Sequence, residues 1–217
     1  MKVFLTAMEC EAESVVRNLE NAVESSVFGR RVVRGTLGGV LTAVVVAGVG
    51  KANAAAGTQL AVGTLGADAI INVGVAGGLD PSLKVGAVYR AGRAVEYDFD
   101  LTKVNGSTVG TPDECDSPFF DLAAAGDWPV ATVATGDRFT DDERDFDFLR
   151  KTFGASVRDM ELGAVAHAAF HAGVPVYSFK AITNVVGQGA MTLQYKANLS
   201  RCLDVLAESV PAFFAAV

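Results

Sequence analysis

The sequence is poor in cysteine, histidine and positive charge, and each shortage narrows the class of protein. Its 217 residues include 3 cysteines, 2 histidines, and 18 Lys and Arg against 25 Asp and Glu, which gives a formal net charge of −7. This acidic balance argues against nucleic-acid binding, which depends on a basic face. No apolar run approaches the roughly 20 residues that cross a bilayer. We therefore expect neither a nucleic acid nor a membrane as a partner.

The few cysteines and histidines offer no obvious metal site. Cys10, Cys115 and Cys202 lie far apart and fit no zinc spacing, which indicates free thiols in a reducing compartment. His167 and His171 are four residues apart on a predicted helix, but no HExxH motif and no third ligand is evident. We expect no metal. The chain opens on a predicted strand rather than a signal peptide, which favours a cytoplasmic location.

Strands and helices alternate along the whole chain, and no Pro- or Ser-rich linker divides it, so we expect a single domain of residues 1–217. Apolar runs predict strands at 2–6, 26–33, 40–47, 69–73, 87–94, 130–134, 157–159 and 176–183. Periodic segments predict helices at 9–21, 50–65, 142–152, 161–172 and 193–216. Residues 101–128 lack periodicity and predict a long loop with a short helix. The pattern predicts an α/β fold with a largely parallel sheet, whose ligands bind beyond the carboxyl ends of the strands.

Acidic, amide and glycine-rich segments follow the ends of several of these strands. Glu9 and Glu11 follow the first, a Gly-rich run at 74–78 follows the central one, and Met160-Glu161 and Asn184 follow later ones. Taken singly, the acids suit a helix start, the methionine suits a core and the glycines suit a turn. The glycine run matches neither a dinucleotide fingerprint nor a P-loop.

The combination of these elements is more specific than any one of them. The segments AMECE (7–11), AGVGK (47–51), INVGVAGGLDPSLKVG (71–86), ATGDRF (134–139), RDMELGAVAH (158–167) and VPVYSFKAITNVV (174–186) occur in that order. The chain resembles the purine nucleoside phosphorylase and nucleosidase superfamily, and most closely its 5′-methylthioadenosine/S-adenosylhomocysteine nucleosidase group. The resemblance implies a three-layer α/β/α sandwich around a twisted, mostly parallel mixed sheet. It also implies a cytoplasmic homodimer that acts on a small purine nucleoside and uses no cofactor or metal.

The resemblance also implies roles for individual residues in cleaving a ribose C1′–N9 bond. Glu161 would hold the sugar hydroxyls and favour a cationic transition state, with Met160 as an apolar floor. Glu11 would bind the attacking water, Asn184 would contact N7 of the purine, and Phe139 and Thr140 would flank the base. The remaining predicted substrate contacts are Met8, Val49, Val75, Ala76, Gly77, Asp159 and Lys180.

Four positions depart from a family pattern or divide its branches. Asn72 stands where the phosphorylases hold phosphate with an arginine, which favours hydrolysis. Val75 replaces a hydroxyl-bearing residue, and Lys180 replaces an arginine near the water. Asn184 replaces an aspartate. It is compatible with binding of adenine but favours 6-oxopurine bases, because one amide NH₂ can bridge N7 and O6.

Several alternatives to methylthioadenosine/adenosylhomocysteine hydrolysis therefore stay open. They are a 6-oxopurine nucleosidase such as futalosine hydrolase, a phosphate-dependent phosphorylase, and a nucleoside-binding relative without turnover. We expect the 187–195 loop and a partner subunit to contact the 5′ substituent. Segment 96–128 departs from the family, and its aromatic residues are further candidates for that wall: Tyr97, Phe99, Phe119 and Phe120.

Overall fold

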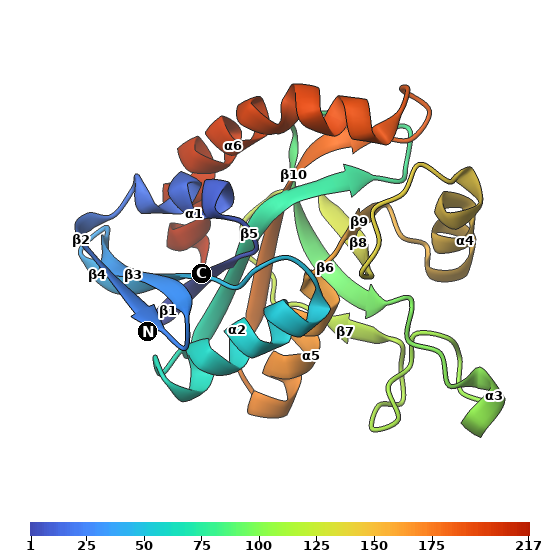
Figure 1. Cartoon of the computed structure of the whole chain (residues 1–217), viewed down its shortest axis with the longest axis horizontal. Helices are drawn as coiled ribbons and strands as arrows, with labels where there is room; N and C mark the ends of the chain where they lie inside the picture. Colours follow the sequence, from blue (N-terminus) through green and yellow to red (C-terminus); the bar gives the residue numbers. More distant parts are fainter.

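The strands form one mixed sheet in a computed structural model that describes residues 1–217 (Figure 1). Their order is β10-β6-β8-β9-β5-β1-β4-β3-β2, and β7 pairs with β6. The bounds are β1 Lys2–Thr6, β2 Glu20–Val27, β3 Arg30–Leu37, β4 Val40–Val46, β5 Ala69–Gly78, β6 Val88–Glu96, β7 Phe119–Asp121, β8 Val130–Thr135, β9 Val157–Asp159 and β10 Val176–Val185. The central ladders, β4 to β1, β1 to β5 and β5 to β10, are parallel. The predicted α/β class with a mixed sheet is confirmed.

One half of the sheet closes on itself. β10 pairs in parallel with β5 and antiparallel with β6, while β6, β8 and β9 lead back to β5. These five strands form a ring, so the central strand has hydrogen-bonding neighbours along its whole length. The ring brings the carboxyl ends of β5, β9 and β10 together, and such ends are where α/β folds bind ligands.

Helices cover both faces of the sheet (Figure 1). Their bounds are α1 Glu9–Val16, α2 Lys51–Gly63, α3 Thr102–Asn105, α4 Glu143–Phe153, α5 Leu162–Ala172 and α6 Met191–Ala216. α1 and α6 pack on one face, where Phe4, Phe179 and Phe213 are fully buried. α2 and α5 pack on the other, around Leu5, Ile70 and Val165. Burial of unbroken apolar strands between two helical layers is the main stabilising term of this fold.

Three expected elements differ from the structure. The helix expected over 9–21 ends at Val16, because the chain turns into β2 at Glu20. The strand expected over 26–33 is wrong, since it spans the turn between β2 and β3, where Phe28 and Gly29 have positive φ. The strand expected over 69–73 is longer than predicted. β5 continues to Gly78, because β10 pairs with that glycine run on one side and β9 on the other.

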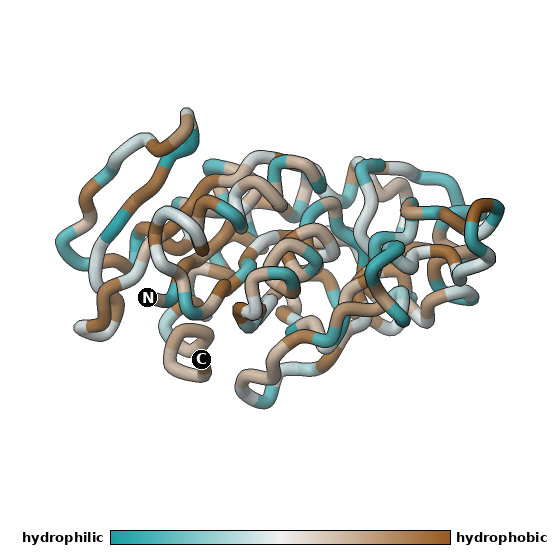
Figure 2. Tube along the Cα trace, turned by 90° about the horizontal axis from the view of Figure 1, so that it is seen from below, coloured by the Kyte–Doolittle hydropathy of each residue, from teal (hydrophilic) through white to brown (hydrophobic).

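Strands β2 and β3 form an arm at one end of the molecule, which Figure 2 shows extending from the main body. Five consecutive residues at the start of β2 are exposed, and Phe28 at the turn is 86% exposed. No helix has the length and apolar character needed to cross a membrane.

Candidate active site

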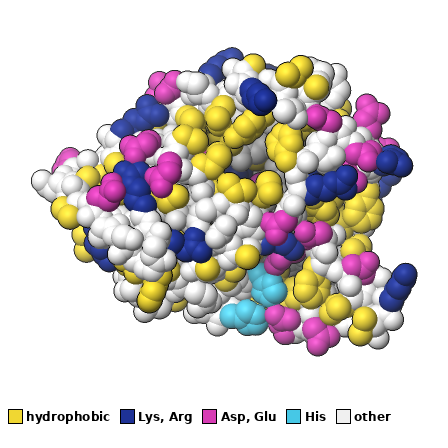
Figure 3. All heavy atoms as spheres, viewed as in Figure 1, with side chains coloured by type: hydrophobic (Ala, Val, Ile, Leu, Met, Phe, Trp, Pro, Cys, Tyr) yellow, Lys and Arg dark blue, Asp and Glu magenta, His cyan; other side chains and the backbone are white.

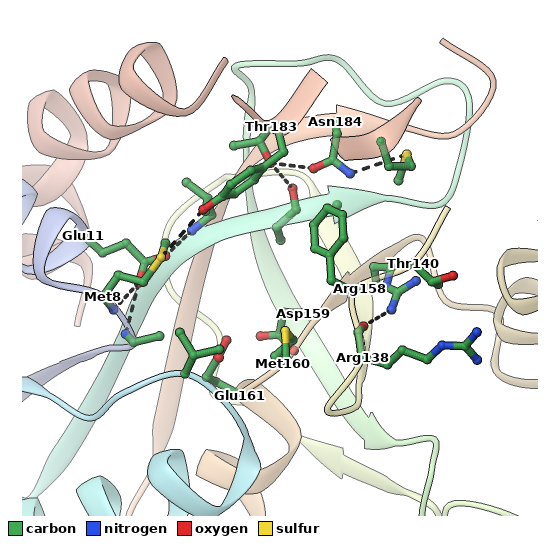
Figure 4. A pocket seen from close by; sticks show the side chains of 18 residues that line it. Met8, Glu11, Arg138, Thr140, Arg158, Asp159, Met160, Glu161, Thr183 and Asn184 are labelled. Carbon is green, nitrogen blue, oxygen red and sulfur yellow. Dashed lines mark hydrogen bonds between the residues drawn. The ribbon is translucent and has the colours of Figure 1, made fainter. Parts of the chain in front are cut away.

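A cavity of about 230 Å³ opens at the carboxyl ends of β1, β5, β9 and β10 (Figure 4). Every residue that the sequence predicted as catalytic or substrate-binding lines it, with the exception of Lys180. Glu11 and Glu161 face the same space although they lie 150 positions apart in the chain. The lining consists of Ala7, Met8, Glu11, Val49, Val75, Ala76, Gly77, Arg138, Phe139, Thr140, Arg158, Asp159, Met160, Glu161, Thr183, Asn184, Met191 and Tyr195.

Glu11 is held in place by backbone N–H groups. Its Oε2 accepts from the amides of Ala7 at 3.1 Å and Met8 at 3.0 Å, and its Oε1 accepts from Val75 at 2.9 Å. Burial raises the pKa of this carboxyl, while the bond from Val75 and the charge of Lys180 act in the opposite direction. The side chain of Val75 lacks the hydroxyl of the family pattern, but its backbone fixes the carboxylate.

Glu161 is anchored by the N-terminus of α2. The Gly50 amide donates to its Oε1 at 2.9 Å, which leaves Oε2 free of protein partners. Gly50 has φ of +96°, a conformation that glycine adopts readily and that aims its N–H at the carboxylate. Next to it, the Lys51 amide donates to Asp137 Oδ1 at 2.7 Å, so one helix start ties together the 47–51 and 134–139 segments.

Asp159 and Lys180 form a buried ion pair below the cavity. The Lys180 ammonium lies 2.8 Å from Asp159 Oδ2, and the side chains are 3% and 1% exposed. Asp159 also accepts from the Thr135 hydroxyl at 2.5 Å and the Leu162 amide at 3.0 Å, so the protein occupies both of its oxygens. Lys180 therefore supports the site from beneath and does not contact the cavity, contrary to the sequence-based expectation.

The charges around this pair set the protonation of the site. Burial lowers the pKa of Lys180, but Asp159, Glu161 and Glu11 together raise it above its usual value, so Lys180 stays charged. Burial, together with the charge of Asp159, raises the pKa of Glu161 to about 7. Glu161 therefore exchanges its proton near neutral pH.

The entrance to the cavity is apolar and aromatic. Phe139 is 51% exposed and Val49 48% exposed, and Phe139 meets Tyr195 edge to face with ring centroids 5.8 Å apart. The Tyr195 hydroxyl lies 3.7 Å from the sulfur of Met8, which joins this wall to the Glu11 side of the cavity. These side chains can cover a large apolar group, but they offer few polar contacts.

Asn184 and two arginines occupy the opposite end. The Thr183 hydroxyl donates to Asn184 Oδ1 at 2.6 Å, while Asn184 Nδ2 has only the sulfur of Met191, at 3.5 Å, as a partner. Arg158 is 7% exposed and donates to the Arg138 carbonyl through Nη2, whereas its buried Nη1 has no partner. Nδ2 of Asn184 is thus a donor at the cavity without a strong acceptor, and both arginines lie at the same end (Figure 4).

Six lining residues were not named individually from the sequence: Ala7, Arg138, Arg158, Thr183, Met191 and Tyr195. The first four lie within the quoted motifs, and Met191 and Tyr195 lie on α6, in the 187–195 segment expected to contact the 5′ substituent. The aromatic residues suggested for the 5′ wall do not line the cavity. Phe119 and Phe120 instead line a separate groove beside α5, and Tyr97 packs against Gly136.

Comparison with known proteins identifies the family of the chain. A family model described as the phosphorylase superfamily matches residues 2–215. The chain belongs to the phosphorylase superfamily. The 5′-methylthioadenosine/S-adenosylhomocysteine nucleosidase of Geobacillus kaustophilus (strain HTA426) is 31% identical over 195 residues, which cover 84% of this chain and 83% of that protein. The resemblance noted from the motifs is confirmed.

Two solved structures share the fold. Futalosine hydrolase of Helicobacter pylori strain 26695 gives a TM-score of 0.91 at 21% identity, covering 100% of this chain and 97% of that chain. The 5′-methylthioadenosine/S-adenosylhomocysteine nucleosidase from Neisseria meningitidis, in complex with methylthio-immucillin-A, gives 0.90 at 24% identity, covering 100% and 99%.

A methyl group at Gly74 should disable the site without unfolding the protein. A Cβ there would lie 2.6 Å from Glu11 Oε1, so Gly74→Ala must push the carboxylate out of its bonds. We expect the hydrolysis proposed below to fall at least tenfold in kcat/KM, while the circular dichroism spectrum is unchanged. Gly63→Ala is the matched control, because a Cβ at Gly63 meets nothing within 4 Å. Equal activity of both variants would contradict the placement of Glu11.

Neutralising Glu161 should stabilise the protein in a pH-dependent way. Because folding raises the pKa of this carboxyl from 4.5 to about 7, the folded state loses stability as pH rises between these values. Glu161→Gln keeps the acceptor for Gly50. It should raise the free energy of unfolding by up to ~3 kcal/mol at pH 8 and by little at pH 4.5, measured by urea denaturation. Glu208→Gln, an exposed change of the same charge, should give no such difference. A constant effect of Glu161→Gln across this range would refute the assigned protonation.

Proposed function

We propose that the protein is a purine nucleosidase, which hydrolyses the C1′–N9 bond of 5′-thio nucleosides such as methylthioadenosine or adenosylhomocysteine. The observation that carries this proposal is that two carboxylates, the buried Glu11 and the half-buried Glu161, face one cavity that has an apolar entrance and an amide donor at its far end. The family and the printed names of the curated relatives support the same chemistry.

The sugar binds at Glu161 in this proposal. Its free Oε2 accepts hydrogen bonds from the ribose hydroxyls, and Met160 supplies an apolar surface beneath the ring. As the glycosidic bond breaks, the sugar becomes an oxocarbenium-like cation, and the ionised carboxylate stabilises this charge more than that of the neutral substrate. The buried surroundings strengthen the interaction because water is excluded.

Water attacks from the Glu11 side. Three backbone amides hold the Glu11 carboxylate in one orientation, and its remaining lone pairs can accept from a water molecule in the cavity. The raised pKa of Glu11 makes the carboxylate a stronger base than an exposed glutamate, which suits it to take a proton from the attacking water.

The purine lies at the Asn184 end. The Thr183 hydroxyl fixes Asn184 through Oδ1, so Nδ2 points its hydrogen atoms away from that bond and can donate to N7 of the base. This donation stabilises negative charge on the departing purine. Asn184 has no acidic proton, so it assists departure by hydrogen bonding alone.

The surroundings of Glu11 favour water over phosphate as the attacking group. Asn72, at the position of the phosphorylase arginine, is buried and bonded to the Leu5 carbonyl and to Ser178. The cations that line the cavity are Arg138 and Arg158 at the base end, whereas Lys180 is committed to Asp159. A phosphate dianion next to two carboxylates would be repelled.

A second candidate is a 6-oxopurine nucleoside as the substrate, and the weakly bonded amide of Asn184 at the base end favours it. A 6-oxopurine presents adjacent acceptors, N7 and O6, which one Nδ2 amide group can bridge. Adenine presents an N7 acceptor but a donor at N6. Hydrolysis at the same site serves either base, and the identity of the released base distinguishes them.

We further propose that the whole chain, residues 1–217, works as one cytoplasmic domain and forms a homodimer. The family match over 2–215 supports a single domain. Exposed apolar side chains, among them Phe139, Leu193 and Phe170, support burial against a second copy. Sedimentation velocity of the purified protein tests the dimer.

The hydrolysis proposal predicts release of free base without phosphate. Purified protein is incubated with methylthioadenosine, adenosylhomocysteine, inosine and futalosine, with and without phosphate, and the bases are separated by chromatography. We expect phosphate-independent cleavage, and a loss of at least 10²-fold in kcat for Glu161→Gln, since its charge acts in the transition state. Strict phosphate dependence would instead identify a phosphorylase. Thermal stabilisation by a nucleoside without base release would identify a binding protein.

Asn184→Asp is predicted to shift base preference toward aminopurines. An ionised aspartate accepts from N6 of adenine and repels O6 of a 6-oxopurine, whereas Asn184 can donate to either N7. The measurement is the ratio of kcat/KM for methylthioadenosine to that for futalosine or inosine, and we expect it to rise at least tenfold. Because a ratio cancels losses common to both substrates, an unchanged ratio would show that Asn184 does not read the base.

A further inference from the structure

Both histidines lie on one face of α5, outside the candidate active site. His167 and His171 are four residues apart, so their side chains project from successive turns of the helix. Figure 3 shows the two histidines side by side at the surface, next to acidic side chains. Glu114, from the connection between α3 and β7, completes a group that we call the histidine cluster: Glu114, His167 and His171. Glu114 could not be predicted as a third member from the sequence, because it lies 53 positions from His167.

The three side chains direct their ligand atoms at one point. Glu114 Oε1 lies 2.8 Å from His167 Nε2 and 3.1 Å from His171 Nε2, and all three atoms are within 4.8 Å of one another. Ligand atoms around a tetrahedral zinc ion are separated by roughly 3.3 Å, as bond lengths of about 2.0–2.1 Å require. Small rotations of exposed side chains bring the cluster to that spacing, since His171 is 52% and Glu114 44% exposed.

A carboxylate behind the cluster orients His167. Its Nδ1 lies 2.8 Å from Oε1 of Glu96, which is 6% exposed, and Lys51 lies 3.2 Å from the other oxygen of Glu96. Phe120 stacks on the imidazole, with centroids 4.9 Å apart. A carboxylate that accepts from the second nitrogen is the usual support for a metal-binding histidine, since it fixes the ring and turns the Nε2 lone pair outward.

This arrangement leaves a place for a cation between His167 and Glu114. When Nδ1 donates to Glu96, Nε2 of a neutral imidazole carries a lone pair, and it faces a carboxylate oxygen at 2.8 Å. Two acceptors at that distance need a proton or a cation between them; without metal a proton on Nε2 fills this place, and a metal ion would displace it. The nearby acids, Glu96, Asp98 and Glu114, outnumber the single ammonium of Lys51, so a divalent ion also balances the local charge.

We propose that the histidine cluster binds one divalent transition-metal ion, with zinc as the fitting metal. Two imidazole nitrogens and one carboxylate oxygen are a zinc-type ligand set, and the exposed side of the cluster leaves water to fill the fourth position. None of the three residues lines the active-site cavity. The ion would fasten the connection that carries Glu114 to α5, and this role is independent of the proposed hydrolysis.

Calorimetric titration with ZnCl₂ of protein stripped with EDTA tests the site. We expect one zinc ion per chain, and at least tenfold weaker binding for His171→Ala and for Glu114→Gln. Both residues are substantially exposed, so these variants should fold, and circular dichroism verifies it. CoCl₂ should give visible d–d absorption in the wild-type protein that both variants lose.

Two controls separate this site from general zinc binding. Cys115→Ser removes the thiol next to Glu114 in sequence, and Glu143→Gln removes an exposed carboxylate elsewhere, so both should bind zinc like the wild type. The proposal is overturned if the wild-type protein shows no saturable zinc binding. It is also overturned if His171→Ala and Glu114→Gln bind zinc as tightly as the two controls.

Discussion

A single buried ammonium supports the acidic half of the candidate site. Lys180 is 3% exposed and touches Asp159 directly, and it acts on Glu161 and Glu11 through space. Removing one partner of such a buried pair leaves an uncompensated charge, which typically costs 3–5 kcal/mol. One positive charge cannot fully balance three carboxylates. Burial and the surplus negative charge therefore raise the pKa of Glu161, the side chain proposed to contact the sugar.

Backbone dipoles supply the rest of the support. Glu11 accepts three amide hydrogens, and Glu161 accepts one from the first turn of α2. Such donors are fixed by the fold and need no reorganisation when charge develops on a substrate. Their dependence on backbone position explains why the close approach at Gly74 matters, since the chain there must pass within contact distance of the Glu11 carboxylate.

Much of this site could be predicted from the sequence, and the limits have physical causes. Apolar strand runs indicated the fold class and the end of the sheet where ligands bind, because strand order brings the carboxyl ends together. The resemblance to the nucleosidase group named most of the cavity lining. The glycine run at 74–78 was left outside the predicted strand, since its pairing by β9 and β10 is a long-range effect. Lys180 was expected at the cavity, but the alternation of β10 and its pairing with Asp159 place it beneath. Arg158, within a recognised motif, gave no signal that its guanidinium would reach the base end. Glu114 is brought to the two histidines by a loop without periodicity.

Asn184 has a consequence for how the purine departs in the proposed reaction. Its amide can donate a hydrogen bond but cannot transfer a proton. The purine therefore departs as an anion, which water protonates afterwards. Turnover by such an enzyme depends on the intrinsic acidity of the free base. Nucleosides whose free bases are more acidic are therefore cleaved faster, whatever their affinity for the pocket.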